Sequence, residues 1–294
     1  MDRLSRTMFS AASKPNSKLT SQPTTEANVF SLSPFGVEIH GLDVRQIVEN
    51  NLTELKRLLA EQGVAVIRNQ LISDAEFVNF LKQLGPLTFT VGEKPVADQP
   101  LLNVVSNVGR DRPPRSVFHT DTSYITQPPA YTALKAIRLP SAGGETLFSN
   151  QYIAYERLPT AVKRQLRGAE VLHVVSGLTL PSGEETQTWH PLFRRHPLSG
   201  KLALYLSTPE RCQKIRTPSG ELAEKGAQII RLLYRHSIRQ HTLYRHRWQS
   251  GDIVIWDNRC TLHRADHSQV VGDRILHRGL ISGEKPLPQT SARP

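Results

Sequence analysis

Short strand-like runs dominate the middle and the C-terminal part of the chain, and they constrain its fold more than any other feature. They cover residues 103–106, 116–120, 131–137, 145–149, 171–177, 202–206, 251–257 and 274–281. Apolar residues at helical spacing or capping patterns predict helices near residues 52–60, 73–84, 159–167 and 221–236. This order predicts a mostly β protein with flanking helices (α+β), built on a β-sandwich or jelly-roll core.

Length and composition suit one domain with a substantial core. The chain has 294 residues, of which 38% are hydrophobic. Residues 1–28 are rich in Ser, Thr, Lys and Pro and predict a disordered N-terminal arm, which leaves residues 29–290 as a single domain. Two cysteines are too few for a disulfide framework, and no apolar run is long enough to span a membrane. We therefore expect a cytoplasmic protein, and a homo-oligomer stays open.

The formal charge of +11 raises the question of nucleic-acid binding. The 37 basic residues outnumber the 26 acidic ones, but they are scattered apart from a concentration over residues 234–248. No zinc-finger, helix-turn-helix or RNP pattern accompanies them. We expect a solvated basic surface, with no nucleic acid and no membrane as partner.

A histidine and a carboxylate stand two residues apart in the stretch VFHTDT, residues 117–122. If this stretch is a strand, His119 and Asp121 project from the same face. Two imidazoles and one carboxylate on one face can hold Fe(II) and leave three positions open. The apolar strand at 251–257 is followed by His263, which we predict to be the third ligand. The alternative is a structural, hydrogen-bonded His–Asp pair.

The last predicted strand, residues 274–281, places Arg274 and Arg278 on the same face. Burying two cations is unfavourable unless anions meet them, so we expect the pocket to hold carboxylates. The alternative is that this face is open to solvent. Thr146 follows a Gly-Gly turn and could donate a hydrogen bond to such a carboxylate. Tyr124, just beyond the HTD triplet, either lines the substrate pocket or belongs to the core.

Five motifs occur in order along the chain. They are HTD at 119–121, GGETLF at 143–148, HPLFRRHP at 190–197, GDIVIWDNRCTLH at 251–263 and RILHR at 274–278. Together they resemble the taurine dioxygenase-like (TauD/TfdA) family of Fe(II)/2-oxoglutarate-dependent dioxygenases. The resemblance runs from about Phe30 to Pro286. It implies a double-stranded β-helix fold and an oxidoreductase that uses Fe(II), 2-oxoglutarate and O₂.

The same resemblance assigns roles to individual residues. The implied iron ligands are His119, Asp121 and His263. Arg274, eleven residues after the last ligand, is implied to bind the distal carboxylate of 2-oxoglutarate with help from Thr146. Arg278 is implied to bind the anionic group of a small substrate. Polar residues that the taurine enzyme has upstream of HTD have no counterparts at 112–117 or 87–90, which argues against taurine.

Five further segments point to one branch of the family. They are FHTDTSY at 118–124, YTALKA at 131–136, NQYIAYERLP at 150–159, LYLSTPERC at 204–212 and LHRADHS at 262–268. They resemble the PvcB-like, isonitrile-processing enzymes of secondary metabolism. This resemblance implies desaturation of a tyrosine-derived isonitrile, as in isonitrile biosynthesis of the paerucumarin and rhabduscin type, with or without loss of CO₂. The alternatives are a hydroxylase of taurine or another sulfonate or carboxylate, a nucleic-acid demethylase, and a non-catalytic binding protein.

Overall fold

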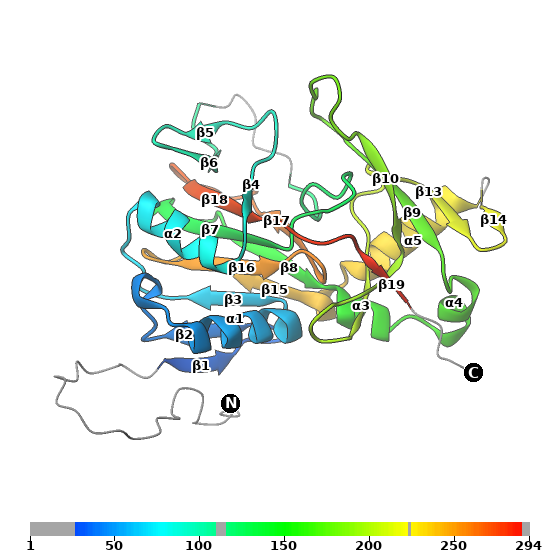
Figure 1. Ribbon diagram of the computed structural model, residues 1–294, viewed down its shortest axis with the longest axis horizontal. Helices are drawn as coiled ribbons and strands as arrows, with labels where there is room; N and C mark the ends of the chain where they lie inside the picture. Colours follow the sequence, from blue (N-terminus) through cyan, green and yellow to red (C-terminus); the bar gives the residue numbers. More distant parts are fainter. Residues whose placement is uncertain (1–26, 110–115, 223–224, 290–294) are drawn as a thin grey trace.

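The computed structural model describes residues 27–109, 116–222 and 225–289, which are coloured in Figure 1. The predicted arm over residues 1–28 lies outside this range except for its last two residues. The arm and the single domain over residues 29–290 therefore stay predictions. None of the helices among the described residues is both long and apolar enough to cross a membrane.

A nine-stranded sheet forms the larger part of the molecule, on the left of Figure 1. Its strands are β1 (Asn28–Ser31), β2 (Val37–His40), β3 (Val64–Ile67), β4 (Leu87–Thr88), β5 (Pro95–Val96), β6 (Gln99–Ser106), β7 (Tyr131–Arg138), β16 (Ile253–Asp257) and β18 (Ile275–Ile281). They are ordered β1-β2-β3-β16-β7-β18-β6-β5, and β4 pairs with β18 beside this path. All pairs are antiparallel except β2 with β3. Segments far apart in the sequence thus meet in one sheet.

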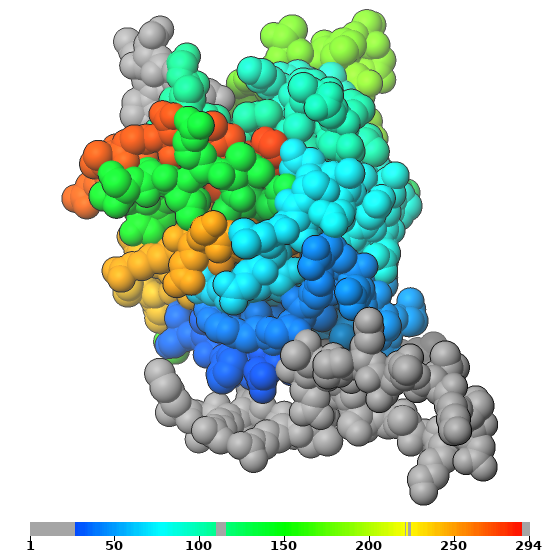
Figure 2. All heavy atoms as spheres, turned by 90° about the vertical axis from the view of Figure 1, so that its left-hand side faces the viewer, coloured from blue at the N-terminus to red at the C-terminus, as the bar shows by residue number. Residues whose placement is uncertain are grey.

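Helices cover one face of this sheet. They are η1 (Val44–Gln46), α1 (Glu49–Gln62) and α2 (Asp74–Leu84). The predicted capping box is present, since the Ser73 and Glu76 side chains bond each other's backbone N–H groups at the start of α2. Leu59 of α1 and Phe77 of α2 pack in one buried cluster with Ile255 of β16. In Figure 2 the blue and cyan atoms of this part of the chain lie against green, orange and red atoms of later segments.

A second, three-stranded sheet packs on the opposite face. It consists of β15 (Leu243–His246), β8 (Thr146–Asn150) and β17 (Thr261–Ala265), in that order. Side chains alternate along β16, so Ile255 faces the helices while Trp256 faces this sheet. The rings of Trp256 and Phe148 lie 5.4 Å apart between the two sheets. The two facing antiparallel layers confirm the predicted mostly β, jelly-roll core.

The remaining elements form a smaller lobe on the right of Figure 1. Its strands are β9 (Glu170–Val174), β10 (Gln187–Pro191), β13 (Cys212–Thr217) and β14 (Gly220–Glu221) in one sheet, and β11 (Phe193–Arg195), β12 (Leu202–Leu204) and β19 (Leu287–Pro288) in another. Its helices are α3 (Gln151–Glu156), α4 (Thr160–Gln165), α5 (Gly226–Ser237) and η2 (Gln240–Thr242). The lobe has its own apolar core, in which Val171, Phe193 and Ile230 are buried.

The predicted strand over residues 116–120 is wrong. Only His119 pairs in this stretch, through an isolated antiparallel bridge to His263. The chain then turns at residues 121–124, and Thr122 takes a positive φ of 45°. A left-handed residue is incompatible with a continuous strand, so strand alternation cannot be what orients Asp121. The helix predicted near residues 221–236 starts later, at Gly226 of α5.

A buried ionic network joins the core to the smaller lobe. The Asp257 carboxylate accepts hydrogen bonds from Arg259 Nη1 at 2.8 Å and from His196 Nε2 at 2.9 Å. Arg259 Nε also donates to Glu284 Oε1 at 3.0 Å. Burial acts to raise the pKa of Asp257, but Arg259 and His196 lower it to about 2. The carboxylate is therefore charged at neutral pH and held by two partners.

Asp257→Asn is expected to lower the free energy of unfolding by about 3–5 kcal/mol, because it removes one charge from a buried pair. Since the folded pKa lies below the ordinary value of 3.8, this stabilisation is present above about pH 4 and is lost as the pH falls through 2. Urea unfolding of both proteins at pH values from about 2 to about 7 measures both effects. Asp273→Asn, which removes an exposed partner of Arg138, is the matched control and should change stability by less than about 1 kcal/mol. Equal losses in the two variants would contradict the prediction.

Candidate metal centre and the arginines beside it

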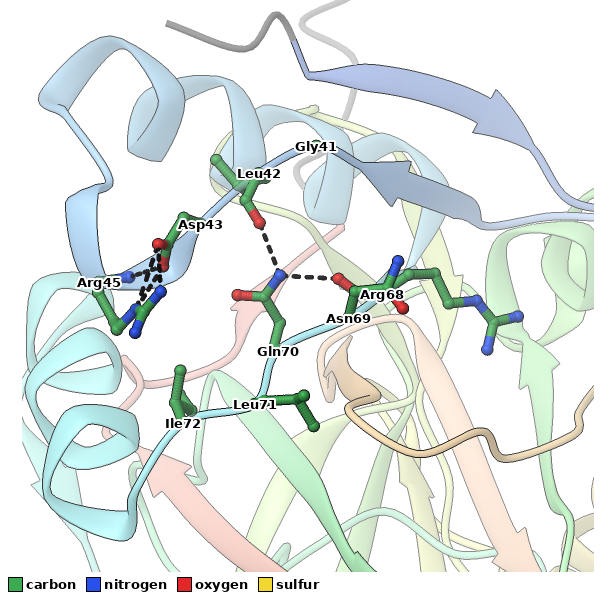
Figure 3. Close-up of a pocket in the computed structure, with 9 residues that line it drawn as sticks. All are labelled: Gly41, Leu42, Asp43, Arg45, Arg68, Asn69, Gln70, Leu71 and Ile72. Atoms are coloured by element: carbon green, nitrogen blue, oxygen red, sulfur yellow. Dashed lines mark hydrogen bonds and ion pairs between the residues drawn. The ribbon is translucent and has the colours of Figure 1, made fainter. Parts of the chain in front are cut away.

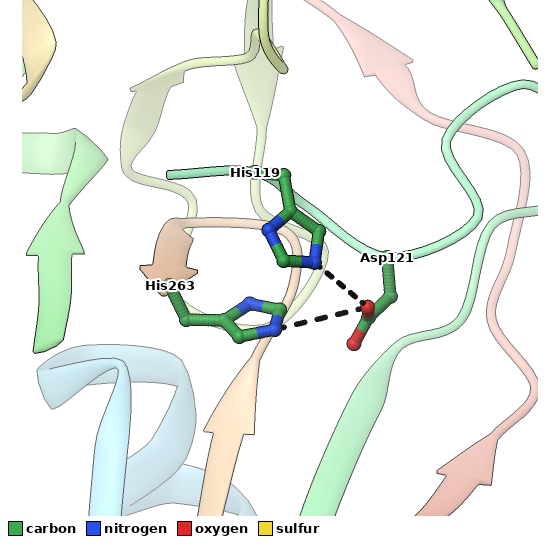
Figure 4. A group of neighbouring side chains, drawn as sticks. All are labelled: His119, Asp121 and His263. Carbon is green, nitrogen blue, oxygen red and sulfur yellow. Dashed lines mark ion pairs between the residues drawn. The ribbon is translucent and has the colours of Figure 1, made fainter. Parts of the chain in front are cut away.

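Three predicted ligands come together at one point (Figure 4). The Nε2 atoms of His119 and His263 lie 3.6 and 3.8 Å from Oδ1 of Asp121. One ligand atom from each residue lies within 4.8 Å of the others. Paired backbone hydrogen bonds of 3.0 and 2.9 Å between His119 and His263 place the two imidazoles side by side. A turn and the strand β17, rather than a single strand, therefore bring the three side chains together.

Hydrogen bonds behind the cluster orient the ligand atoms. Thr132 Oγ1 donates to Asp121 Oδ2 at 2.7 Å and accepts from the Asn258 amide at 2.8 Å, so Oδ1 is left facing the imidazoles. His119 Nδ1 lies 2.9 Å from the Val117 carbonyl, which can only accept. The proton is thus on Nδ1, and the lone pair of Nε2 points toward the cluster.

The charges of the three groups suit a divalent cation. Burial lowers the pKa of His263 to about 3, although Asp121 opposes this, so the imidazole is neutral. Burial acts to raise the pKa of Asp121, but His263, His119 and Arg278 hold it well below its ordinary value. Two imidazoles and one carboxylate are the donor set of Fe(II) sites that keep positions open for other ligands. The residues present therefore fit the predicted iron.

Arg274 is a buried cation with no acidic partner among the described residues. Its side chain is 1% exposed; Nε donates to the Gly144 carbonyl at 2.8 Å and Nη2 to Thr146 Oγ1 at 3.1 Å. Burial lowers the pKa of Arg274 to about 10, which still leaves it charged at neutral pH. An uncompensated buried charge is unfavourable, so this site is suited to an anion. The predicted 2-oxoglutarate carboxylate fits it.

The surroundings of Arg274 match the prediction for Thr146. The Thr146 hydroxyl accepts from Arg274 and from Trp248 Nε1, which leaves its own proton available to an anion. Gly144 has a φ of 79°, and a Cβ there would lie 3.0 Å from Cδ of Arg274. The glycine thus gives the arginine side chain the room it occupies.

Arg278 lies beside the cluster but is already paired. Its Nη2 contacts a carboxylate oxygen of Glu93 and lies 3.4 Å from Asn103 Oδ1. Its Nη1 lies 3.7 Å from Asp121 Oδ1. Glu93 was missed from the sequence, because it is 185 residues away from Arg278 and belongs to none of the motifs. The predicted binding of a substrate anion by Arg278 stays a prediction.

A cleft of about 130 Å³ adjoins the cluster. Thr122, next to Asp121, lines it together with Tyr124, Leu180 and Leu280. Tyr124 is only 6% exposed, and burial raises the pKa of its hydroxyl. Tyr124 thus has both features that the sequence left as alternatives, since it is buried and it lines this cleft.

A second hollow of about 220 Å³ lies away from these residues (Figure 3). Its polar groups bond mainly to one another: the Gln70 amide donates to the carbonyls of Leu42 and Arg68 at 2.6 and 2.7 Å, and Asp43 binds Arg45. It contains none of the predicted site residues and offers no reactive group in place of them.

Comparisons with known proteins agree on one family. The family model described as "Taurine catabolism dioxygenase TauD, TfdA family" matches residues 28–280. The chain is 29% identical over 273 residues to the alpha-ketoglutarate-dependent 2,4-dichlorophenoxyacetate dioxygenase of Cupriavidus pinatubonensis, covering 83% of this chain and 93% of that protein. It is 28% identical over 283 residues to the alpha-ketoglutarate-dependent sulfonate dioxygenase of Saccharomyces cerevisiae, covering 86% of this chain and 65% of that protein. The crystal structure of a taurine dioxygenase from Burkholderia xenovorans matches with a TM-score of 0.75 at 28% identity, covering 90% of this chain and 93% of that one.

Proposed function

Because the chain belongs to the TauD/TfdA family and is therefore an Fe(II)- and 2-oxoglutarate-dependent dioxygenase, we propose that it oxidises a small organic anion. The observation that carries the proposal is a His–Asp–His cluster beside a cleft, together with two buried arginines, Arg274 and Arg278. In this proposal the iron ligands are His119, Asp121 and His263. Arg274 and Thr146 bind the distal carboxylate of 2-oxoglutarate, and Tyr124 lines the substrate pocket.

The protein's part in the reaction is to hold and orient the reactants. The iron, when bound, supplies the oxidising chemistry by coupling the decarboxylation of 2-oxoglutarate to the activation of O₂. Arg274 fixes the far end of 2-oxoglutarate by charge, so its keto acid end can be directed toward the ligand cluster. Thr132 and the Val117 carbonyl keep the lone pairs of Asp121 and His119 directed at the metal position.

An anionic substrate is supported by the relatives and by the buried guanidinium of Arg278 beside the ligand cluster. The two curated relatives described above are named for 2,4-dichlorophenoxyacetate and for sulfonates, which are small anions. Arg278, the predicted partner of the substrate's anion, would have to exchange its contact with Glu93 for the substrate.

The finer proposal is desaturation of a tyrosine-derived isonitrile. It is supported by the segments that resemble the isonitrile-processing branch, among them FHTDTSY at 118–124 and LYLSTPERC at 204–212. Two hydrogen atoms leave the substrate, O₂ is reduced, 2-oxoglutarate becomes succinate and CO₂, and the second oxygen atom leaves as water. The alternative is hydroxylation of a sulfonate or carboxylate, in which the substrate gains one oxygen atom.

The test is to supply the iron-loaded protein with 2-oxoglutarate, O₂ and one of three acids: tyrosine isonitrile, 2,4-dichlorophenoxyacetate or taurine. Succinate formation and the mass of each acid are measured. Tyrosine isonitrile is expected to lose two hydrogen atoms, or two hydrogen atoms and CO₂. Turnover of only one of the other acids would overturn the isonitrile and keep the small anion. If none of the three acids stimulates succinate formation, the proposal of a small anionic substrate fails.

A further inference from the structure

The turn that carries Asp121 is held weakly by its own backbone. It covers residues 121–124, and Thr122 in it has a left-handed φ of 45°. This conformation is unfavourable for a β-branched residue and persists where the surrounding structure imposes it. The hydrogen bond from Ile125 N–H to the Thr122 carbonyl is long, at 3.5 Å. The position of Asp121 in Figure 4 therefore depends on contacts from other elements.

His190 of β10 supplies such a contact from the smaller lobe. Its Nε2 lies 3.0 Å from the carbonyl of Ser123 and 3.0 Å from the carbonyl of Ile125. Both carbonyls can only accept, so Nε2 carries the ring proton and shares it between them. Burial lowers the pKa of His190 to about 4, which keeps the imidazole neutral at neutral pH. One neutral ring therefore joins two carbonyls of the stretch that follows Asp121.

A second histidine on the neighbouring strand contacts the same turn. His173 of β9 places its Nδ1 3.0 Å from the hydroxyl of Ser123. Both histidines are buried, and their ring centroids lie 5.2 Å apart. The ring of Tyr205 packs against both, with its centroid 5.4 Å from that of His173 and 5.7 Å from that of His190. The smaller lobe thus fixes the two imidazoles that meet the turn.

The hairpin of β9 and β10 also lines the cleft beside the ligand cluster. The connection between these two strands contributes Leu180 and Glu184 to the lining, and the turn contributes Thr122 and Tyr124. The same turn therefore carries a candidate iron ligand and a wall of the cleft. Contacts between the hairpin and the turn position both of them.

We propose that His190 is a positioning residue for the metal centre, which holds the turn so that Asp121 presents its carboxylate to the two imidazoles of the cluster. The inference rests on the proposed iron ligands, and it gives the first histidine of the HPLFRRHP motif a part in metal binding. Loss of an outer partner of a metal ligand typically lowers metal affinity about 10- to 100-fold. His190 acts through backbone carbonyls, so we expect an effect at the lower end of this range.

The test compares His190→Phe, which keeps a ring but removes the donor, with His190→Gln, whose amide can donate to both carbonyls. The dissociation constant of Fe(II) is measured by anaerobic titration with 2-oxoglutarate present, followed by the visible charge-transfer band of the chelate. His190→Phe is expected to raise it about 10-fold, and His190→Gln to keep it within about threefold of the wild type. The matched control is His236→Phe, which loses a ring hydrogen bond of 2.8 Å to the Ala154 carbonyl elsewhere in the smaller lobe. It should change the constant by less than about twofold.

A second measurement needs no metal. Amide hydrogen exchange over residues 119–126 is followed by mass spectrometry in the metal-free protein. His190→Phe is expected to speed this exchange about 5- to 10-fold, as for the loss of one hydrogen bond, and to leave exchange in α1 unchanged. Ser123→Ala, which removes the hydroxyl that meets His173, should speed it by a smaller factor. This milder variant decides the test if His190→Phe does not fold.

Three outcomes would overturn the inference. If His190→Phe matches the wild type in Fe(II) binding and in exchange over residues 119–126, His190 does not position the turn, and the proposed function stands. If His236→Phe weakens Fe(II) binding as much as His190→Phe does, the effect is a general loosening of the smaller lobe. If the wild type gives no band with Fe(II) and 2-oxoglutarate, the proposed iron centre fails and the inference falls with it.

Discussion

Asp121→Ala protein is expected to lose the chelate of Fe(II) and 2-oxoglutarate together with its activity. The carboxylate is the only anionic member of the cluster, and both imidazoles face its Oδ1 atom. Removal of an outer partner of a metal ligand typically lowers metal affinity about 10- to 100-fold, so loss of a ligand itself should lower it by more than about 100-fold. Anaerobic titration with Fe(II) in the presence of 2-oxoglutarate, followed by the weak visible charge-transfer band of the chelate, measures this.

The chain offers a matched control for this variant. His40 and Glu38 also form a histidine–carboxylate pair two residues apart, with Nε2 and Oε1 2.5 Å apart, but on an exposed part of the sheet. His40→Ala should leave the band and succinate formation unchanged, whereas His119→Ala should lose both. A normal band and normal turnover in both Asp121→Ala and His119→Ala would show that iron is bound elsewhere.

Arg274→Ala is expected to raise the concentration of 2-oxoglutarate needed for half-maximal succinate formation about 10- to 100-fold. A charged hydrogen bond contributes about 1.5–3 kcal/mol, which corresponds to this range. The requirement is expected to rise because Arg274 is buried, charged and without an acidic partner among the described residues, so it is suited to bind the distal carboxylate. Steady-state kinetics with varied 2-oxoglutarate, at a fixed concentration of an accepted acid, measures the effect.

A neighbouring arginine separates this effect from a general loss of positive charge. Arg138 of β7 pairs in the sheet with Ile275 of β18, the residue that follows Arg274. Its side chain forms an exposed ion pair with Asp273, with the nitrogen and oxygen 2.7 Å apart. Arg138→Ala should therefore leave the 2-oxoglutarate requirement unchanged. An unchanged requirement in Arg274→Ala as well would exclude Arg274 as the partner of the distal carboxylate.

The sequence was most informative where a motif is short and its residues act locally. The HTD triplet, the histidine after an apolar strand and the Gly-Gly turn before Thr146 all pointed to residues that the structure brings together. The reason given for His119 and Asp121 was nevertheless wrong in part, since alternation along a strand does not orient them. Thr122 has a left-handed backbone conformation, which a continuous strand does not allow. Neither the residue type of Thr122 nor the residues beside it predict this conformation.

Contacts between distant loops could not be predicted. Glu93 and Arg278 belong to segments whose hydrophobic patterns say nothing about which acid meets which base. The same holds for His173 of β9, whose Nδ1 lies 3.0 Å from the hydroxyl of Ser123. Such pairs depend on the whole arrangement of the sheets, because side chains from separate loops meet only after the strands have paired.

The buried charge of Arg274, which has no acidic partner among the described residues, also links the stability of the protein in a cell to its co-substrate. Without an anion the folded state bears the unfavourable desolvation of a cation that the unfolded chain exposes to water. A ligand that binds only the folded state adds about 2.7 kcal/mol of stability when its concentration is a hundred times its dissociation constant. Since unfolded protein is removed by proteases and aggregation, the amount of enzyme that survives in a cell would then rise and fall with the supply of 2-oxoglutarate.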